Sequence, residues 1–203
     1  MINKRKAKKG IKKILLAAGK SERFGEKNKL SEIFNGKPLI NNILDTLLEI
    51  FDTSELKIIV GHDQKLIKHL INNQEIEILE NINYKSGIGT SISLAVKNLD
   101  TDIKGVMIIP ADMPYITSKD LLNLENKFWE YNCKKVIIPQ YKSKTGNPVI
   151  LPGIYFDTLK KLKDDFGARS LIADKDIITL KTGFGTILDI DTRDELDKAK
   201  IKS

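Results

Sequence analysis

The strongest constraint on the fold is a regular alternation of short apolar runs with helical patterns. Residues Lys12–Ala18 and Leu56–Val60 are rich in aliphatic and β-branched side chains, which is typical of buried strands. Between them, Pro38–Ile50 repeats its apolar residues at the i, i+3, i+4 spacing of an amphipathic helix. Repeated strand–helix units predict an α/β fold of three layers, in which a mostly parallel twisted sheet carries helices on both faces.

The alternation continues to the end of the chain. Further strands are expected at Ile76–Leu79, Gly105–Pro110, Val136–Pro139, Val149–Leu151, Ile177–Leu180 and Thr186–Leu188. Further helices are expected at Gln64–Ile71, Ser91–Leu99, Thr117–Tyr131 (capped by Thr117 or Ser118), Ile154–Leu162, Ala168–Ala173 and Thr192–Lys200. The pattern is less regular around Tyr141–Pro152, which predicts an antiparallel edge or a β-ribbon insertion there.

The net charge of +7 is concentrated at the N-terminus, because residues 1–13 hold seven basic side chains and no acidic one. The remaining chain holds 27 basic and 27 acidic residues. We therefore predict a basic tail over residues 1–13, of the kind that is often disordered, and a single domain over residues 14–203. A balanced domain offers no basic face for nucleic acid, although the tail itself leaves a nucleic-acid or membrane-surface contact open.

The composition also indicates the cellular compartment of the protein. No apolar run approaches the roughly 20 residues that span a bilayer, and no apolar segment follows the basic N-terminus as in a secretory signal. The single cysteine, Cys133, cannot form an internal disulfide, and no Cys/His cluster suggests zinc. A cytoplasmic protein without a membrane partner is expected.

Ligands of open α/β sheets bind at the carboxyl ends of the strands, so the loop after the first strand is the first candidate site. It reads Leu16-Ala17-Ala18-Gly19-Lys20-Ser21-Glu22-Arg23-Phe24-Gly25 and is followed by Lys27 and Lys29. Small residues allow the backbone amides to approach an anion, while an arginine and a lysine supply charge for phosphate oxygens. The loop lacks both the P-loop and the G-x-G-x-x-G signatures, and an ordinary glycine-containing turn is the alternative.

Carboxylates follow two other strands. Asp112 ends the strongly apolar run Val106–Ala111, and Asp191 follows Asp189 near the C-terminus. Because Mg²⁺ is usually held by one or two carboxylates together with substrate phosphates, Asp112 and Asp191 are candidate metal ligands. The alternatives are a turn at Asp112 and a helix cap at Asp191 or Thr192.

Glycines and hydroxyls mark weaker candidates. In Asn83–Ser91, Gly87 and Ser91 lie before or at a predicted helix start, where amides favour anions or a polar base edge, although helix capping explains them equally. Gly61, directly after the strand Leu56–Val60, is a further candidate for nucleotide binding.

Taken in this order, the motifs resemble the MobA-like nucleotidyltransferases, and among them the molybdenum cofactor cytidylyltransferases, from about Lys13 to Lys200. The opening loop resembles L-A-A-G-x-S-x-R-[MF]-G-x-x-K, with one extra residue before the lysine. Lys27 or Lys29 could be the family lysine, and the following Leu30 favours Lys29. The resemblance implies a Rossmann-like nucleotidyltransferase fold.

Other segments carry the same resemblance. Tyr84–Ser91 is similar to a G-[MIL]-[GS]-x-S loop, Asp112-Met113-Pro114 to a D-[MQ]-P metal site, and Asp189–Thr192 to a closing D-I-D-T. Gly146-Asn147-Pro148 is similar to G-H-P, but Asn147 replaces the histidine, and Gly167-Ala168-Arg169 is similar to G-A-R. The resemblance implies that Asn147 and Arg169 contact the acceptor.

The implied reaction is transfer of CMP from CTP to the terminal phosphate of molybdopterin or molybdenum cofactor, with Mg²⁺ and release of pyrophosphate. CTP is preferred because the guanylyl branch reads L-A-G-G where this chain has Ala18, whose methyl could crowd a purine. A molybdoenzyme or its chaperone is a further expected partner. The implied catalytic residues are Lys29, Arg23 and Asp112, and the implied nucleotide-binding residues are Leu16, Ala17, Ala18, Gly19, Ser21, Gly61, Gly87 and Ser91.

Four alternatives stay open. A guanylyltransferase, or a transferase acting on a sugar phosphate or a phosphorylated alcohol, would use the same glycine loop. A cofactor chaperone would bind the pterin without chemistry. An NAD(P)-dependent oxidoreductase fits only the α/β pattern, because the dinucleotide signature is missing.

Overall fold

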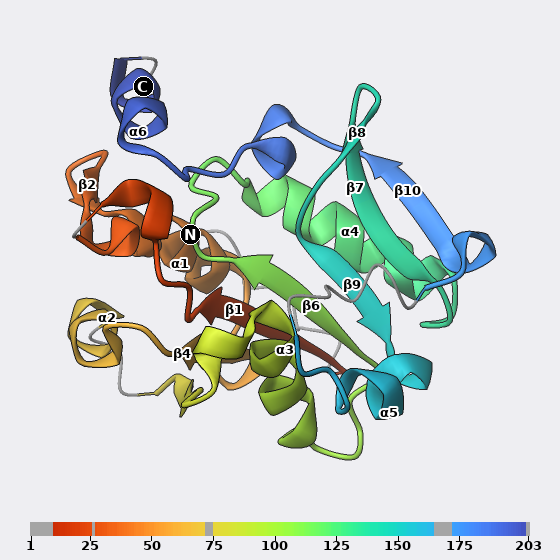
Figure 1. Ribbon diagram of the computed structural model, residues 1–203. Helices are drawn as coiled ribbons and strands as arrows, with labels where there is room; N and C mark the ends of the chain where they lie inside the picture. Colours follow the sequence, from red (N-terminus) through yellow and green to blue (C-terminus); the bar gives the residue numbers. More distant parts are fainter. Residues whose placement is uncertain (1–9, 26, 72–74, 165–171, 202–203) are drawn as a thin grey trace.

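The computed structural model describes residues 10–25, 27–71, 75–164 and 172–201. Its centre is an eight-stranded sheet in the order β10-β7-β9-β6-β1-β4-β5, with β8 paired to β7 (Figure 1). The strands are β1 (Ile11–Ala17), β4 (Leu56–Val60), β5 (Glu77–Glu80), β6 (Gly105–Pro110), β7 (Val136–Tyr141), β8 (Lys144–Thr145), β9 (Val149–Pro152) and β10 (Ile177–Lys181). A separate pair is formed by β2 (Ile33–Phe34) and β3 (Lys37–Pro38).

The sheet is mostly parallel, as predicted. β1 runs parallel to both β4 and β6, β4 to β5, and β7 to β10. β9 is antiparallel to both of its neighbours, β6 and β7. The antiparallel direction expected for this segment is therefore confirmed. A short β-ribbon is present as well, where β8 pairs with the end of β7, but β9 lies inside the sheet rather than at its edge.

Helices cover both faces, which completes the three predicted layers (Figure 1). They are α1 (Leu39–Ile50), α2 (Gln64–Ile71), α3 (Ile88–Lys97), α4 (Ser118–Glu130), α5 (Phe156–Leu159) and α6 (Arg193–Ile201).

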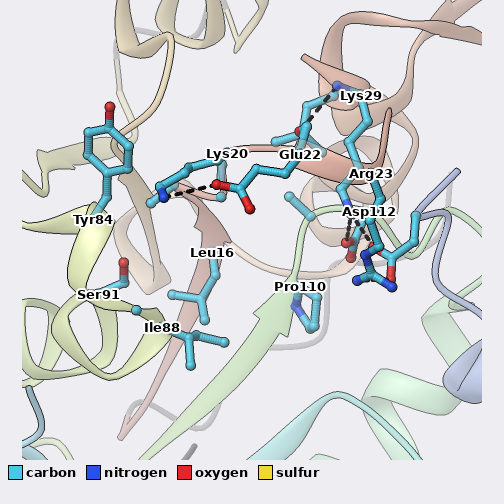
Figure 2. Close-up of a pocket in the computed structure, with 18 of the residues that line it drawn as sticks. Leu16, Lys20, Glu22, Arg23, Lys29, Tyr84, Ile88, Ser91, Pro110 and Asp112 are labelled. Atoms are coloured by element: carbon cyan, nitrogen blue, oxygen red, sulfur yellow. Dashed lines mark hydrogen bonds and ion pairs between the residues drawn. The ribbon is translucent and has the colours of Figure 1, made fainter. Parts of the chain in front are cut away.

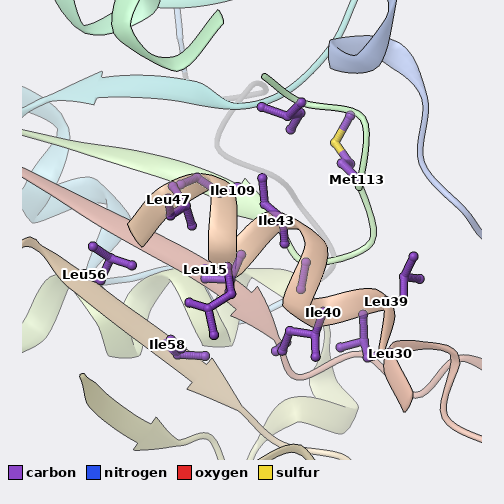
Figure 3. Packing of buried hydrophobic residues seen from close by; sticks show 14 of the residues in the cluster. Leu15, Leu30, Leu39, Ile40, Ile43, Leu47, Leu56, Ile58, Ile109 and Met113 are labelled. Atoms are coloured by element: carbon purple, nitrogen blue, oxygen red, sulfur yellow. The ribbon is translucent and has the colours of Figure 1, made fainter. Parts of the chain in front are cut away.

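Alternate residues of each strand supply the two cores. Leu15 and Ile109 pack with Ile43 and Leu47 of α1 on one face (Figure 3). Ile14, the neighbour of Leu15 in β1, packs with Ile92 of α3 on the other.

The C-terminal third differs from its sequence prediction in two places. The strand expected at Thr186–Leu188 is the 3-10 helix η8 (Phe184–Ile187), in which the Thr186 amide donates to the Gly183 carbonyl at 3.2 Å. The helix expected at Ile154–Leu162 is reduced to α5 behind the 3-10 helix Gly153–Tyr155. Most of the helix expected at Ala168–Ala173 lies outside the described residues.

The N-terminal boundary also needs correction. β1 begins at Ile11, so Lys12 and Lys13 belong to the sheet and not to the tail. Lys13 is fully buried and its Nζ lies 2.7 Å from Glu55 Oε1. A run of basic residues in the sequence conceals this pairing because Glu55 is distant along the chain. Among the described residues, no helix has both the length and the apolar character needed to cross a membrane.

Candidate active site

A pocket of about 560 Å³ opens at the carboxyl ends of β1 and β6, between the loop after β1 and the start of α3 (Figure 2). Parallel strands end at the same edge of the sheet, which is why the predicted motifs meet there. The pocket is lined by Leu16, Ala17, Ala18, Gly19, Lys20, Ser21, Glu22, Arg23, Lys29, Leu30, Tyr84, Lys85, Gly87, Ile88, Ser91, Pro110, Ala111, Asp112 and Asp191.

The loop after β1 is held in place by its own side chains. Ser21 adopts a left-handed conformation with φ of 57°, and its carbonyl accepts from the Phe24 amide at 2.8 Å. Phe24 is buried in the core and anchors the turn. Gly25 follows with φ of 98°, a conformation that favours glycine. This fold of the loop presents Arg23 to the pocket.

Lys29 lies between two carboxylates. Its Nζ is 2.5 Å from Asp112 Oδ2 and 2.6 Å from Asp191 Oδ1. An Arg23 guanidinium nitrogen is 2.6 Å from the other oxygen of Asp191. The structure thus brings together Arg23, Lys29, Asp112 and Asp191, which the sequence analysis selected from separate motifs.

Burial and charge act against each other in this cluster. Burial alone would lower the pKa of Lys29, but the charges and hydrogen bonds of Asp112 and Asp191 outweigh it and raise that pKa. Burial alone would raise the pKa of Asp191, but Lys29 and Arg23 hold it below its ordinary value. For Asp189, burial raises the pKa, and the nearby charges of Asp191 and Asp112 add to the effect. Lys29 therefore stays cationic and Asp191 anionic at neutral pH.

The residues present fit a divalent cation that shares its ligands with a phosphate. Asp112 Oδ1 is a buried acceptor with no hydrogen-bond partner among the described residues. Asp191 Oδ1 shares the Lys29 ammonium with Asp112 Oδ2, so the two carboxylates face the same point. The described part of the chain contains no group of three or more His, Cys, Asp or Glu side chains that could hold a metal unaided. Two carboxylates are what Mg²⁺ needs when phosphates and water complete its shell.

The opposite end of the pocket is more apolar. Leu16, Tyr84 and Ile88 lie there, with Ile88 44% exposed, and Lys20 and Ser91 lie beside Tyr84 (Figure 2). Gly61 lies beneath this wall rather than in the lining. A Cβ on Gly61 would come within 2.7 Å of Tyr84 Cβ and 3.0 Å of the Ala18 methyl. Gly61 therefore sets the position of the wall through packing, and its predicted direct contact with the nucleotide stays a prediction.

Asn147, one of the two expected acceptor residues, is not in the pocket lining. The Asn147 amide donates to the Thr186 carbonyl at 2.8 Å, just before β9. Because Val149 pairs with Ile108 of β6, the antiparallel register carries Asn147 toward the end of β6 that bears Asp112. Arg169 lies outside the described residues, so its role stays a prediction.

Sequence reasoning missed two buried amides that organise the pocket. Asn28 Oδ1 accepts from the Leu30 amide at 3.1 Å and so caps the short helix that carries Lys29. Asn81 Nδ2 donates to Thr90 Oγ1 at 2.8 Å and to Ser91 Oγ at 2.9 Å. Asn28 precedes Lys29 directly, which was a usable signal, whereas Asn81 lies apart from every quoted motif.

Comparison with known proteins agrees with this geometry. The family model described as the MobA-like NTP transferase domain matches residues 13–178. The molybdenum cofactor cytidylyltransferase of Escherichia coli is 25% identical over 192 residues, covering 92% of this chain and 94% of that protein. The bifunctional protein GlmU of Pseudothermotoga lettingae is 29% identical over 126 residues, covering 62% of this chain. The chain spans about a quarter of the length of the GlmU proteins it matches.

Solved structures share the fold. A nucleotidyl transferase from Methanothermobacter superposes with a TM-score of 0.78 at 12% identity, covering 96% of this chain and 97% of that one. The manganese complex of Rv0371c from Mycobacterium tuberculosis superposes with a TM-score of 0.78 at 17% identity, covering 96% of this chain and 100% of that one. These similarities confirm the Rossmann-like nucleotidyltransferase fold.

Proposed function

Since the chain belongs to the MobA-like NTP transferase family, we propose that it transfers CMP from CTP to the terminal phosphate of molybdopterin or molybdenum cofactor and releases pyrophosphate. The observation that carries the proposal is the division of one pocket into two ends. The apolar end, with Tyr84 and Ile88, suits a base, while the charged end, with Lys29, suits phosphates. A nucleoside triphosphate has the same division along its length.

The residues of the pocket account for the chemistry. The amides of the loop after β1 and the guanidinium of Arg23 would bind the β- and γ-phosphates. Lys29 would stabilise the charge that develops on the α-phosphate, because its ammonium is already held in place by two carboxylates. The acceptor phosphate is anionic, so no protein base is needed, and catalysis rests on positioning and charge.

We propose Mg²⁺ as the cation, held by Asp112 and Asp191. When bound, it would neutralise charge on the phosphate oxygens. The unpartnered Asp112 Oδ1 supports this assignment, and so does the manganese complex of the structurally similar mycobacterial protein. A cytoplasmic location, a single domain over most of the chain and delivery of the product to a molybdoenzyme or its chaperone complete the proposal.

The choice of CTP rests on Ala18. Its methyl lies beside the Gly61 position at the apolar end of the pocket, where a larger base would need room. Ala18→Gly is expected to weaken the discrimination against GTP by a factor of roughly 10, since shape changes of one methyl in a pocket are worth about 1–3 kcal/mol. Competition binding of CTP and GTP measures this. An unchanged ratio of CTP affinity to GTP affinity would show that Ala18 does not set the preference for the base.

The test of the reaction is to incubate the protein with CTP, Mg²⁺ and molybdopterin and to follow pyrophosphate release and the mass of the product. Asp112→Asn is the matched control, because it keeps the size of the side chain and removes its charge. We expect a cytidylylated product with the wild type and turnover reduced by about 10²–10³-fold with the variant. Near-normal turnover of Asp112→Asn would contradict the metal assignment.

A second acceptor class stays an alternative. A transferase that acts on a sugar phosphate would bind its nucleotide with the same loop after β1. Running the same assay with sugar 1-phosphates and each of the common nucleoside triphosphates separates the two. Product with a sugar phosphate and none with molybdopterin would move the chain to that group.

A further inference from the structure

We propose that Asn81 is a positioning residue that occupies one lone pair of the Ser91 hydroxyl and leaves its proton to donate into the pocket, toward an acceptor on the bound base. The inference rests on the proposed binding of a nucleoside triphosphate and adds a determinant of which base edge is accepted. Ser91 lines the pocket at the first turn of α3, and Asn81 lies behind it, 4% exposed.

The orientation of the Asn81 amide is fixed by its surroundings. The backbone amide of Asn83 can only donate, and it lies 3.0 Å from Asn81 Oδ1. The carbonyl oxygen must therefore face Asn83, which turns the NH₂ group toward the hydroxyls of Thr90 and Ser91. The Asn81 main chain is fixed as well, because its amide donates to the Val60 carbonyl at the end of β4 at 2.7 Å.

The polarity of Ser91 follows from this arrangement. An amide NH₂ has no acceptor, so Ser91 Oγ must accept from Asn81 at 2.9 Å and direct its own proton elsewhere. Thr90 receives the same NH₂ group at 2.8 Å, but its hydroxyl donates to the Gly87 carbonyl at 2.8 Å and is satisfied within the loop. Of the two hydroxyls, Ser91 is the one that lines the pocket.

The chemical class of the ligand group is therefore an acceptor. The ring carbonyl or the unprotonated ring nitrogen of a pyrimidine can accept the Ser91 proton, whereas an exocyclic amino group could use only the remaining lone pair of Oγ and would leave that proton without a partner. The Ser91 proton thus contributes to base choice independently of the space left beside Ala18.

The test compares CTP affinity in four proteins by calorimetry: wild type, Asn81→Asp, Ser91→Ala and the double variant. Asn81→Asp keeps the acceptor for the Asn83 amide but replaces the NH₂ group with an oxygen, which would take the Ser91 proton and turn Ser91 into an acceptor. We expect Ser91→Ala to weaken CTP binding about five- to tenfold, and Asn81→Asp to weaken it by at least as much. In the Ser91→Ala background, Asn81→Asp should weaken binding much less, because only its added negative charge then acts on the anionic nucleotide.

Two controls separate this role from a structural one. Thr90→Val removes the other hydroxyl that Asn81 contacts but leaves Ser91 in place, and it should weaken CTP binding less than Ser91→Ala does. Where Asn81→Asp fails to fold, the same cycle is run with Asn81→Ala, for which a smaller loss through Ser91 is expected.

Two results would overturn the inference: an Asn81 variant that binds CTP as the wild type does, or one that loses the same affinity in both backgrounds. A folded wild type that binds no nucleoside triphosphate would instead refute the proposed function. The two failures are thus distinguishable.

Discussion

Two lysines, Lys13 and Lys29, each lie between two carboxylates, the first near the start of β1 and the second beyond its end. Lys13, near the start of β1, has its Nζ 2.7 Å from Glu55 and 3.6 Å from Glu125. Lys29, beyond the other end of β1, has its Nζ 2.5 Å from Asp112 and 2.6 Å from Asp191. Arg23 adds a second cation at Asp191, and the surroundings of the two lysines differ.

The Lys13 cluster is closed. The lysine side chain is 0% exposed, and its Nζ lies 4.0 Å from the centre of the Phe51 ring. The Lys29 cluster borders the pocket, with side chains 13–20% exposed. Removing one partner from a closed cluster leaves buried charge without solvent, whereas a ligand can replace a partner in an open one. The comparison teaches that the same ionic motif is closed off from solvent near the start of β1 and open to the pocket beyond its end.

The largest expected effect comes from breaking the closed cluster. Lys13→Met should lower the free energy of unfolding by about 3–5 kcal/mol, because Glu55 and Glu125 would be left buried without a cation. Urea denaturation measures the change. Lys12→Met is the control, since that lysine donates to the Ser54 carbonyl at 2.8 Å and a smaller loss is expected. A Lys13→Met protein as stable as the wild type would refute the structural role.

The matching change in the open cluster should affect turnover instead. Lys29→Met is expected to reduce kcat by about 10²–10³-fold, as for loss of one group that stabilises transition-state charge. Its effect on stability should be small, because both carboxylates line the open pocket and Arg23 still pairs with Asp191.

Pyrophosphate release, measured alongside urea denaturation, tests this contrast. Lys20→Met serves as the control, because Lys20 lines the same pocket but forms an exposed ion pair with Glu22. It should keep turnover within about tenfold of the wild type. Equal losses from both substitutions would mean that Lys29 acts as one basic residue among several.

The smallest expected effect concerns Glu125, one of the two carboxylates of the closed Lys13 cluster. Burial raises the pKa of Glu125, the charge of Glu55 adds to this, and Lys13 only partly opposes it. The folded protein therefore holds this proton to a higher pH than the unfolded chain does. Ionised Glu125 lowers stability at neutral pH, and the loss is relieved as the pH falls toward the ordinary value of 4.5.

Glu125→Gln keeps the size of the side chain and stays neutral. It should be more stable than the wild type at pH 7, and the difference should shrink as the pH approaches 5. Urea denaturation at the two pH values measures it. A variant less stable than the wild type at pH 7 would show that the ion pair with Lys13 outweighs burial.

The sequence predicted the open cluster much better than the closed one. Asp112 follows β6, as predicted, and so lies at the edge of the sheet where the parallel strands end. Asp191 follows the 3-10 helix η8 rather than the expected strand, and the Ile190 amide, which donates to the Asp112 carbonyl at 3.0 Å, holds it beside Asp112. The Lys13 cluster depends on a long-range pairing with Glu55 that no local pattern records, and the preceding basic run placed Lys13 in the tail.

The sequence likewise predicted one half of the sheet better than the other. Strands β1, β4 and β6 were predicted within one residue of their ends, because long apolar runs mark buried parallel strands. For β9, the sequence predicted the antiparallel direction but not its place inside the sheet. The segment at η8 has strand-like residues, yet its backbone hydrogen bonds go to Gly183 and Asn147 rather than to a neighbouring strand.

The central claim is that the open cluster binds the phosphates of a nucleotide. The most direct test is calorimetric titration of the wild type with CTP, GTP and ATP, each with and without Mg²⁺. The account predicts binding that depends on Mg²⁺ and favours CTP. If a sample shown to be folded bound none of the three nucleotides, this claim would be contradicted.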